Sequence, residues 1–296
     1  MKNQTIGVEV EFTGINRKEA AETVAKYFET TANYVAGIYD AWAIKDTAGR
    51  EWKIMSDSSI KAQEKINGVK INANGQYRCE LVTPILHWSD IETLQEIIRN
   101  LRKAGGFVNE TCGLHTHIGA NGMTAQAVRN LVNTVASREK LFYKALKVHK
   151  NRKRYCKPTS ERFLKDLNEK KPATLEELGK IWYNTDGNLP TFHYHDSRYT
   201  ILNLHALFTK GTVEFRIFNS TLHAGEVKAA IQFSAALVAF AKTQKKTLYR
   251  EVSLENEKFT MRTFLTRLCM NGEEFKTARL HLTKHLEGNA AWRHAC

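Results

Sequence analysis

The chain contains no long apolar run. No stretch of about 18 apolar residues is present that could cross a bilayer, and no apolar signal-peptide segment opens the sequence. We therefore expect a protein that does not use a membrane and is not exported by the signal-peptide route.

Cysteine is scarce, and its spacing excludes the common metal-binding motifs. The 296 residues include five cysteines, an odd number, and none of them forms a Cys-x-x-Cys pair. Unpaired thiols of this kind indicate a reducing compartment, so we predict a cytoplasmic location. The sequence has neither internal repeats nor low-complexity segments, and 42% hydrophobic with 25% charged residues is typical of a globular protein.

Basic residues outnumber acidic ones. Lys and Arg total 44 against 31 Asp and Glu, which gives a formal net charge of +13. Part of the excess lies in residues 144–157, and a solvated helix end or linker is the interpretation we favour for such a run. The alternative is an electrostatic footprint for nucleic acid or another polyanion. The basic side chains concerned are Lys147, Lys150, Arg152, Lys153, Arg154 and Lys157.

Two carboxylates lie two residues apart in an apolar run near the start of the chain. Residues 7–12 read GVEVEF, and in a strand Glu9 and Glu11 would share one face while the apolar side chains point into a core. At roughly 7 Å and an effective dielectric of about 20, two such charges repel by about 2 kcal/mol, so a cation normally lies between them. The alternative is an edge strand with a solvated acidic face.

The same i, i+2 spacing of reactive side chains recurs at two distant places. In residues 112–119, CGLHTHIG, two histidines share one strand face, and in residues 211–218, GTVEFRIF, Glu214 and Arg216 do so. Single acids occur in two further short segments, Glu80 in 79–84 and Asp57 in 56–59. A sheet that gathers carboxylates, imidazoles and guanidinium groups on one face predicts a site for metal and phosphate.

Other interpretations of these residues stay open. His115 and His117, together with nearby acids, could form a zinc-dependent hydrolase site. Glu214 and Arg216 could form a same-face ion pair with no role beyond the sheet. His193 and His195 precede Arg198 and could touch substrate or adenine, although we favour a structural role for them.

Taken in order, six segments resemble the motifs of the amidoligase family. That family belongs to the carboxylate-amine ligase superfamily, which shares the catalytic fold of glutamine synthetase. The segments are GVEVEF (7–12), SDSSI (56–60), ELVTPIL (80–86), CGLHTHIG (112–119), RYTILNL (198–204) and GTVEFRIFNST (211–221). The resemblance implies an α+β fold with a curved, largely antiparallel sheet of the glutamine synthetase type and helices on one face.

The resemblance also implies a reaction. Such ligases use ATP to phosphorylate a carboxylate, and an amine then displaces phosphate from the acyl phosphate. Mg²⁺, or Mn²⁺ in its place, held by carboxylates would orient the phosphates, while arginines would stabilise the transferring group. The expected partners are therefore ATP, a carboxylate substrate and an amine substrate.

Site residues follow from the motifs by resemblance. Glu9 would share one cation with His115 and Glu214, and Glu11 and Glu80 would hold a second. Asp57 matches the acid of a usual Asp-Gly-Ser motif and would also approach a metal, although Ser58 replaces the glycine. The residues expected to contact nucleotide or phosphate are His117, Arg198, Arg216 and Asn203; catalysis would rest on Arg198, Arg216 and Glu214.

The remaining sequence predicts helices around one catalytic domain spanning residues 1–296. Helical periodicity covers residues 17–30, 89–103, 124–148 and 225–243, and Ser89 with Glu92 forms a capping box for the second of these. We predict a basic and helical insertion at about 150–196, either a lid or a structural connection, and a helical C-terminal part at about 225–296. Two further functions are kept as alternatives: a phosphotransferase on the same fold, and a nucleic-acid-binding protein with a vestigial site.

Overall fold

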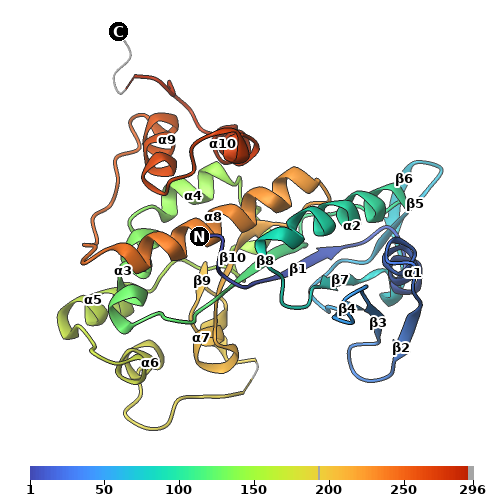
Figure 1. The fold of residues 1–296 in the computed structure, drawn as a ribbon, viewed down its shortest axis with the longest axis horizontal. Helices are drawn as coiled ribbons and strands as arrows, with labels where there is room; N and C mark the ends of the chain where they lie inside the picture. Colours follow the sequence, from blue (N-terminus) through green and yellow to red (C-terminus); the bar gives the residue numbers. More distant parts are fainter. Residues whose placement is uncertain (193, 293–296) are drawn as a thin grey trace.

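The computed structural model describes residues 1–192 and 194–292. Within them the main sheet has eight strands in the order β2-β3-β4-β7-β1-β8-β10-β9, and every neighbouring pair is antiparallel (Figure 1). The strands are β1 (Ile6–Phe12), β2 (Ala32–Val35), β3 (Ala41–Lys45), β4 (Glu51–Met55), β7 (Cys79–Val82), β8 (Gly113–Gly119), β9 (Leu202–Asn203) and β10 (Thr212–Asn219). The expectation of a mixed fold with a largely antiparallel sheet is therefore confirmed.

A separate hairpin and a set of helices complete the fold. The hairpin pairs β5 (Gln63–Ile66) with β6 (Val69–Asn72). The helices are α1 (Arg17–Tyr27), α2 (Ile91–Lys103), α3 (Ala125–Ala136), α4 (Glu139–Ala145), α5 (Glu161–Lys170), α6 (Leu175–Tyr183), α7 (His205–Lys210), α8 (Ala224–Thr243), α9 (Glu257–Arg267) and α10 (Lys276–Thr283).

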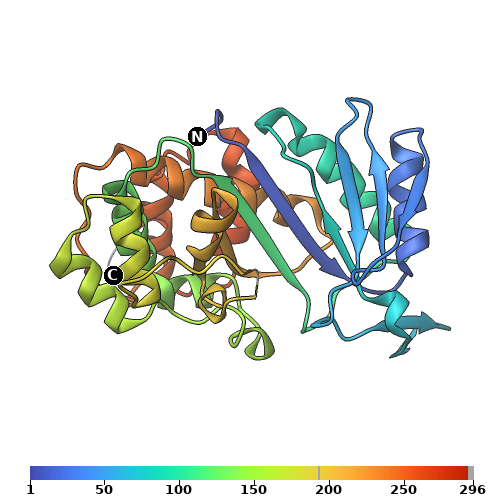
Figure 2. The ribbon, with the colours of Figure 1, turned by 90° about the horizontal axis from the view of Figure 1, so that it is seen from below.

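Alternation along the central strands separates a core face from a polar face. Val8, Val10 and Phe12 of β1 are each at most 1% exposed and belong to the hydrophobic core. Helices α2 and α8 lie along this side of the sheet, as Figures 1 and 2 show from two directions. The intervening residues of β1 point to the opposite face, which is where the charged side chains gather.

Helix α8 corrects one expectation from the sequence. It is long and apolar enough, by length and composition, to span a membrane, so the expectation that no such segment exists was too strict. However, 72% of that segment is buried within the protein, and its residues pack against β8, α2 and α3. A helix that is apolar on all sides is expected where neighbours cover it on all sides.

Two helix boundaries also differ from the predictions. The predicted helix over 124–148 is two helices, because the chain turns at Ser137, whose hydroxyl donates to the Asn133 carbonyl and whose own carbonyl accepts from Val252 N at 3.0 Å. The predicted capping box of Ser89 is wrong: a short turn over Trp88–Asp90 precedes α2, and its aspartate accepts from His87 N.

The two regions predicted to be helical do contain helices. Helices α5 and α6 lie within 150–196, and α8, α9 and α10 account for most of the C-terminal part. In Figure 2 the α5 and α6 pair lies at one end of the sheet, away from α1 and β2 at the other end. The long connection after α6 returns to the sheet at β9.

Candidate active site

Strand register brings the charged residues of distant motifs together on the polar face. β1 lies between β7 and β8, and β8 lies between β1 and β10. The directly opposed pairs are Glu9 with His115, Glu11 with Glu80, and His117 with Glu214. Residues opposed in neighbouring strands point to the same face, so the antiparallel pairing itself builds the site.

Seven side chains form what we call the acid-imidazole cluster: Glu9, Glu11, Asp57, Glu80, His115, His117 and Glu214. They fall into three overlapping groups in which one ligand atom from each residue lies within 4.8 Å of the others. The groups are Glu9 with His117 and Glu214, Glu9 with Glu80 and His115, and Glu11 with Asp57 and Glu80. All the residues that the sequence predicted as metal ligands therefore lie in one place.

The grouping differs from the prediction in one respect. The resemblance assigned His115 to the cation shared by Glu9 and Glu214, whereas the three-residue group of the structure contains His117 in that position. His115 Nδ1 still lies 3.1 Å from Glu9 and 3.9 Å from Glu214. His117, predicted to contact nucleotide, thus takes its place among the candidate ligands.

Glu9 stands at the centre of the cluster. Its two oxygens lie 3.1 Å from His115 Nδ1 and 3.2 Å from His117 Nε2. Burial alone would raise the pKa of Glu9, but the charge of His117, a hydrogen bond with His115 and the short contact with His117 hold it well below its usual range. The Nε2 atom of His117 is buried and makes no hydrogen bond in spite of this short distance. An imidazole nitrogen left in this way fits a metal-ligand atom.

Three carboxylates, those of Glu11, Asp57 and Glu80, meet at the other end of the cluster. Burial and the nearby Asp57 carboxylate raise the pKa of Glu11 to about 7, and burial with the Glu9 and Glu11 carboxylates raises the pKa of Glu80 well above its usual range. The raised pKa values mean that Glu11 and Glu80 hold protons more strongly than usual, which reduces the repulsion among the three carboxylates. A divalent cation with oxygen ligands would meet the same need.

Ser58 does not strain the loop that carries Asp57. Its backbone φ is not positive, so a side chain is tolerated where the family motif has glycine. Asp57 Oδ1 accepts a hydrogen bond of 2.6 Å from Ser59 N, which folds the loop back on itself. This loop follows β4 directly and reaches the cluster at Glu11 and Glu80.

Arg216 and Arg198, both predicted to contact phosphate, differ in their surroundings. Arg216 is 5% exposed, pairs with Glu214 through Nη1, and donates from Nε to the Tyr155 carbonyl. The charge of Arg216 offsets the effect of burial on Glu214 and lowers the pKa of that carboxyl to about 2. Arg198 lines the same cavity as Arg216, with its guanidinium over the rings of Tyr194 and Tyr199.

Asn203 holds Glu214 in place. Its Nδ2 donates to Glu214 Oε2 at 2.6 Å, and its Oδ1 accepts from His205 N at 2.8 Å. The side chain is 2% exposed, so its amide is engaged with the protein on both sides. His195 packs beside His205 and Tyr183, consistent with a structural role, and His193 lies outside the described residues.

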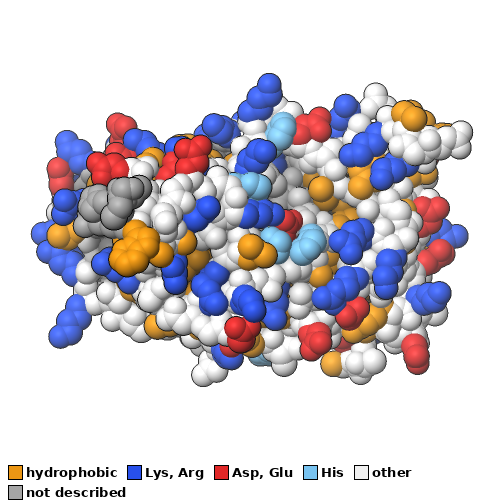
Figure 3. Space-filling view, turned by 90° about the horizontal axis from the view of Figure 1, so that it is seen from above, with side chains coloured by type: hydrophobic (Ala, Val, Ile, Leu, Met, Phe, Trp, Pro, Cys, Tyr) orange, Lys and Arg blue, Asp and Glu red, His pale blue; other side chains and the backbone are white. Residues whose placement is uncertain are grey.

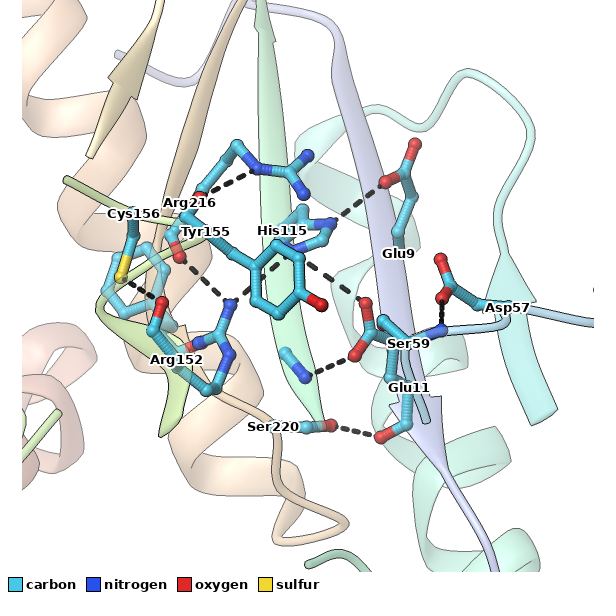
Figure 4. Close-up of polar contacts among 12 residues, drawn as sticks. Glu9, Glu11, Asp57, Ser59, His115, Arg152, Tyr155, Cys156, Arg216 and Ser220 are labelled. Carbon is cyan, nitrogen blue, oxygen red and sulfur yellow. Dashed lines mark hydrogen bonds and ion pairs between the residues drawn. The ribbon is translucent and has the colours of Figure 1, made fainter. Parts of the chain in front are cut away.

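Sequence reasoning placed Arg152 wrongly. As part of the basic run it was expected on a solvated surface, but it is 2% exposed, and its guanidinium lies against His115 (Figure 4). Lys210, 3.8 Å from Glu9, was not singled out. Lys210 is the last residue of α7, and only its position next to the Gly211 that begins a site motif gave a signal in the sequence.

One face of the molecule shows how other basic side chains are distributed (Figure 3). Figure 3 shows Lys and Arg spread over the face that carries α2 and α10, among acids, histidines and apolar groups. Lys153 and Arg154, next to Arg152 in the basic run, are exposed and lie over the rings of Tyr143 and Tyr155. The polyanion footprint, which was the alternative interpretation of this run, therefore loses one of its arginines to the candidate site.

Two cavities open on the acid-imidazole cluster from different sides. One of about 420 Å³ is lined by Glu11, Asp57, three arginines and several tyrosines. Another of about 340 Å³ is lined by Glu9, His117, Lys210 and the apolar residues that follow β7. A larger cavity of about 630 Å³ between α8 and α10 lies on the core side of the sheet and touches none of the seven cluster residues.

Comparisons with known proteins were made against families, curated sequences and solved structures. Residues 2–238 match the family model described as "Putative amidoligase enzyme". The search of curated proteins gave no match. Among solved structures, the chain is similar to a bifunctional glutathione synthetase from Pasteurella multocida, with 10% identity and a TM-score of 0.39 over 95% of this chain. The chain spans 48% of that protein's length.

Proposed function

The chain belongs to the family of putative amidoligase enzymes, and we propose that it is an ATP- and Mg²⁺-dependent carboxylate-amine ligase that forms an amide bond through an acyl phosphate. The observation that carries the proposal is the acid-imidazole cluster, with its three overlapping groups of candidate ligands beside Arg216. In this proposal the sheet is of the glutamine synthetase type and the protein acts in the cytoplasm.

The donor set fits hard divalent cations. Six of the nine positions in the three groups are filled by carboxylates of four glutamates, one by Asp57 and two by histidines. Mg²⁺ and Mn²⁺ favour oxygen ligands and accept an imidazole, whereas structural zinc sites favour cysteine and histidine. When bound, such a cation would neutralise phosphate oxygens that a carboxylate nucleophile must approach.

The chain's own residues would divide the remaining work. Arg216 presents a planar guanidinium next to the cluster, where it can bind two oxygens of a transferring phosphoryl group. Asn203 and Arg216 hold the two oxygens of Glu214, which fixes that carboxylate in one orientation. Arg198 and the tyrosines around it line the larger approach to the cluster.

The two cavities suit a reaction between two bound molecules. They reach the cluster from the Glu9 side and from the Glu11 side, so ATP and the carboxylate substrate can approach separately. The carboxylate oxygen attacks the γ-phosphorus and ADP departs. The amine nitrogen then attacks the acyl carbon, phosphate departs, and the nitrogen loses a proton, so that one ATP yields one amide, ADP and phosphate.

Calorimetric titration of ATP, with and without Mg²⁺, tests the proposal in the wild-type protein and in Glu9→Gln. We expect Mg²⁺-dependent binding in the wild type that the variant loses while both proteins melt cooperatively. Carboxylates and amines are then screened for release of ADP and phosphate together. ADP with a stable phosphorylated product and no phosphate would instead identify a phosphotransferase. Failure of the folded wild type to bind ATP would overturn the proposal.

A further inference from the structure

Arg152 is the arginine of the basic run whose side chain is buried against the main chain of β10. It lies in a short turn over Lys150–Arg152, well after the end of α4, and is among the largest fully buried side chains. Its guanidinium lies over the start of β8: a Cβ added to Gly113 would come within 2.4 Å of Nη2. Glycine at this position therefore leaves the space that Arg152 fills.

The backbone of β10 changes its pairing at the point that Arg152 reaches. Phe215 is opposite Thr116, but Phe218 is opposite Leu114, so two residues of β10 face one residue of β8. A bulge of this kind leaves main-chain groups without their ladder partners and redirects the side chains on it. Arg216 is one of the two bulge residues.

Arg152 supplies hydrogen bonds at this bulge. Its Nη2 donates to the Arg216 carbonyl at 3.1 Å, and its Nη1 donates to the Phe218 carbonyl. Three residues further on, the Tyr155 carbonyl accepts from Arg216 Nε at 3.4 Å. One short segment thus holds Arg216 by its main chain and by its side chain, as Figure 4 shows.

We propose that Arg152 is a positioning residue for Arg216, which fixes the β10 bulge so that the Arg216 guanidinium is aimed at a bound phosphoryl group. The inference rests on the proposed function, because the group that Arg216 is aimed at is the nucleotide. A planar fork is needed, since the two carbonyls accept from two different nitrogens of one guanidinium. Lysine offers a single ammonium and cannot replace it.

The experiment compares binding of the cation with binding of the nucleotide. Mn²⁺ alone and ATP with Mg²⁺ are titrated into the wild type, Arg152→Met and Arg152→Lys. Arg154→Met is the matched control, because Arg154 is exposed on the same segment. Each Arg152 variant should bind Mn²⁺ as well as the wild type or better, since a positive charge near the carboxylates is removed or displaced. Each should bind ATP between about tenfold and a hundredfold more weakly, as expected when hydrogen bonds of a charged group are lost.

A second measurement guards against variants that fold poorly. Arg152→Ala is titrated with ATP in the presence of millimolar guanidinium, with equal urea as control, and guanidinium should restore part of the lost affinity. Equal loss of Mn²⁺ and ATP affinity without rescue would mean that Arg152 serves the fold alone and would overturn the inference. Unchanged ATP binding in both Arg152→Met and Arg152→Lys would also overturn it. A wild type that binds no ATP would overturn the proposed function and this inference with it.

Discussion

The candidate site has a half carried by strands and a half carried by loops. The strand half comprises Glu9, Glu11, Glu80, His115, His117, Glu214 and Arg216, on β1, β7, β8 and β10. The loop half comprises Asp57, Arg152, Arg198 and the tyrosines around the cavity of about 420 Å³. The strand side chains are positioned by the main-chain hydrogen bonds of the sheet. The loop side chains are positioned by the contacts that their own polar end groups make. The strand half should therefore set whether the chemistry occurs, and the loop half which substrate is used.

The largest expected effect belongs to Glu9, at the centre of the strand half. Glu9→Gln removes one carboxylate from two of the three ligand groups at once. We expect divalent-cation affinity to fall by at least about a hundredfold, more than when partners outside the ligand set are removed. Turnover should be lost, and titration calorimetry with Mn²⁺ measures the change directly.

Glu51→Gln is the matched control for that substitution. Glu51 also lies on a strand of the main sheet, but it is exposed and pairs with Lys53. Its replacement should leave cation binding within about twofold, because exposed ion pairs contribute about 1 kcal/mol at most. Wild-type cation affinity in a folded Glu9→Gln protein would refute the assignment of the cluster.

Arg216→Lys tests the role of the guanidinium that contacts both halves of the site. Arg216 pairs with Glu214 in the strand half and donates to the Tyr155 carbonyl in the loop half. A lysine keeps the charge but cannot present two parallel donors to a phosphoryl group. We expect turnover to fall by about tenfold to a thousandfold while cation affinity changes much less, measured by kcat with saturating ATP and by Mn²⁺ titration. Equal kcat values in the wild type and in Arg216→Lys would show that a single positive charge is sufficient at this position.

Protons and cations should compete at the Glu11 end of the cluster. The folded-state pKa of Glu11 is about 7, above the usual value of 4.5, so its protonated form stabilises the metal-free protein. That stabilisation is complete below about pH 4.5 and disappears as the pH rises through 7. If one proton must leave before the cation binds, affinity should be about tenfold weaker at pH 6 than at pH 8.

The neighbouring groups either support this trend or do not titrate in the same range. Burial lowers the pKa of His115 to about 4, so it stays neutral between pH 6 and pH 8, and the Glu214 pKa of about 2 keeps that group ionised. His117, whose pKa is raised by Glu214 and Glu9 against the effect of burial, would also release a proton. The pH dependence of Mn²⁺ affinity across this range should become shallower in Glu11→Gln, and the dependence that remains would belong to His117 and Glu80, whose pKa values are also raised. An unchanged pH dependence would assign the released proton to one of those two groups.

The same division explains what the sequence could predict. A strand repeats every two residues, so the spacing of Glu9 and Glu11, and of His115 and His117, determined that each pair shares a face. That residues of distant segments share metal sites was predicted from the resemblance to the amidoligase motifs, and the pairing of the strands aligns the pairs. Which histidine joins Glu9 and Glu214 could not be predicted, because this depends on side-chain rotamers.

Arg152 shows why the loop half was harder to predict. Six basic residues over a short stretch look alike in the sequence, and a charged side chain in an irregular segment is normally solvated. Its burial depends on two long-range facts: a glycine in β8 that leaves room, and free carbonyls at the β10 bulge. The break between α3 and α4 has the same kind of cause, since a distant residue, Val252, takes the carbonyl of Ser137.

The smallest expected effect belongs to Tyr39 and Tyr194, which line the cavity of about 420 Å³. Tyr39, from the loop before β3, and Tyr194, from the segment before β9, are joined by a hydroxyl contact of 2.7 Å, which raises the pKa of Tyr194 to about 12. Tyr194 is 57% exposed, and removal of one exposed hydrogen bond should change the free energy of unfolding by no more than about 0.5 kcal/mol.

If the segment before β9 does not move during turnover, Tyr39→Phe should leave kcat unchanged and alter KM for the carboxylate substrate by less than about threefold. A KM that rises tenfold in Tyr39→Phe, with the same rise in Tyr194→Phe and none further in the double variant, would show instead that this contact closes a lid over the substrate. The loop half would then control access to the site as well as substrate specificity.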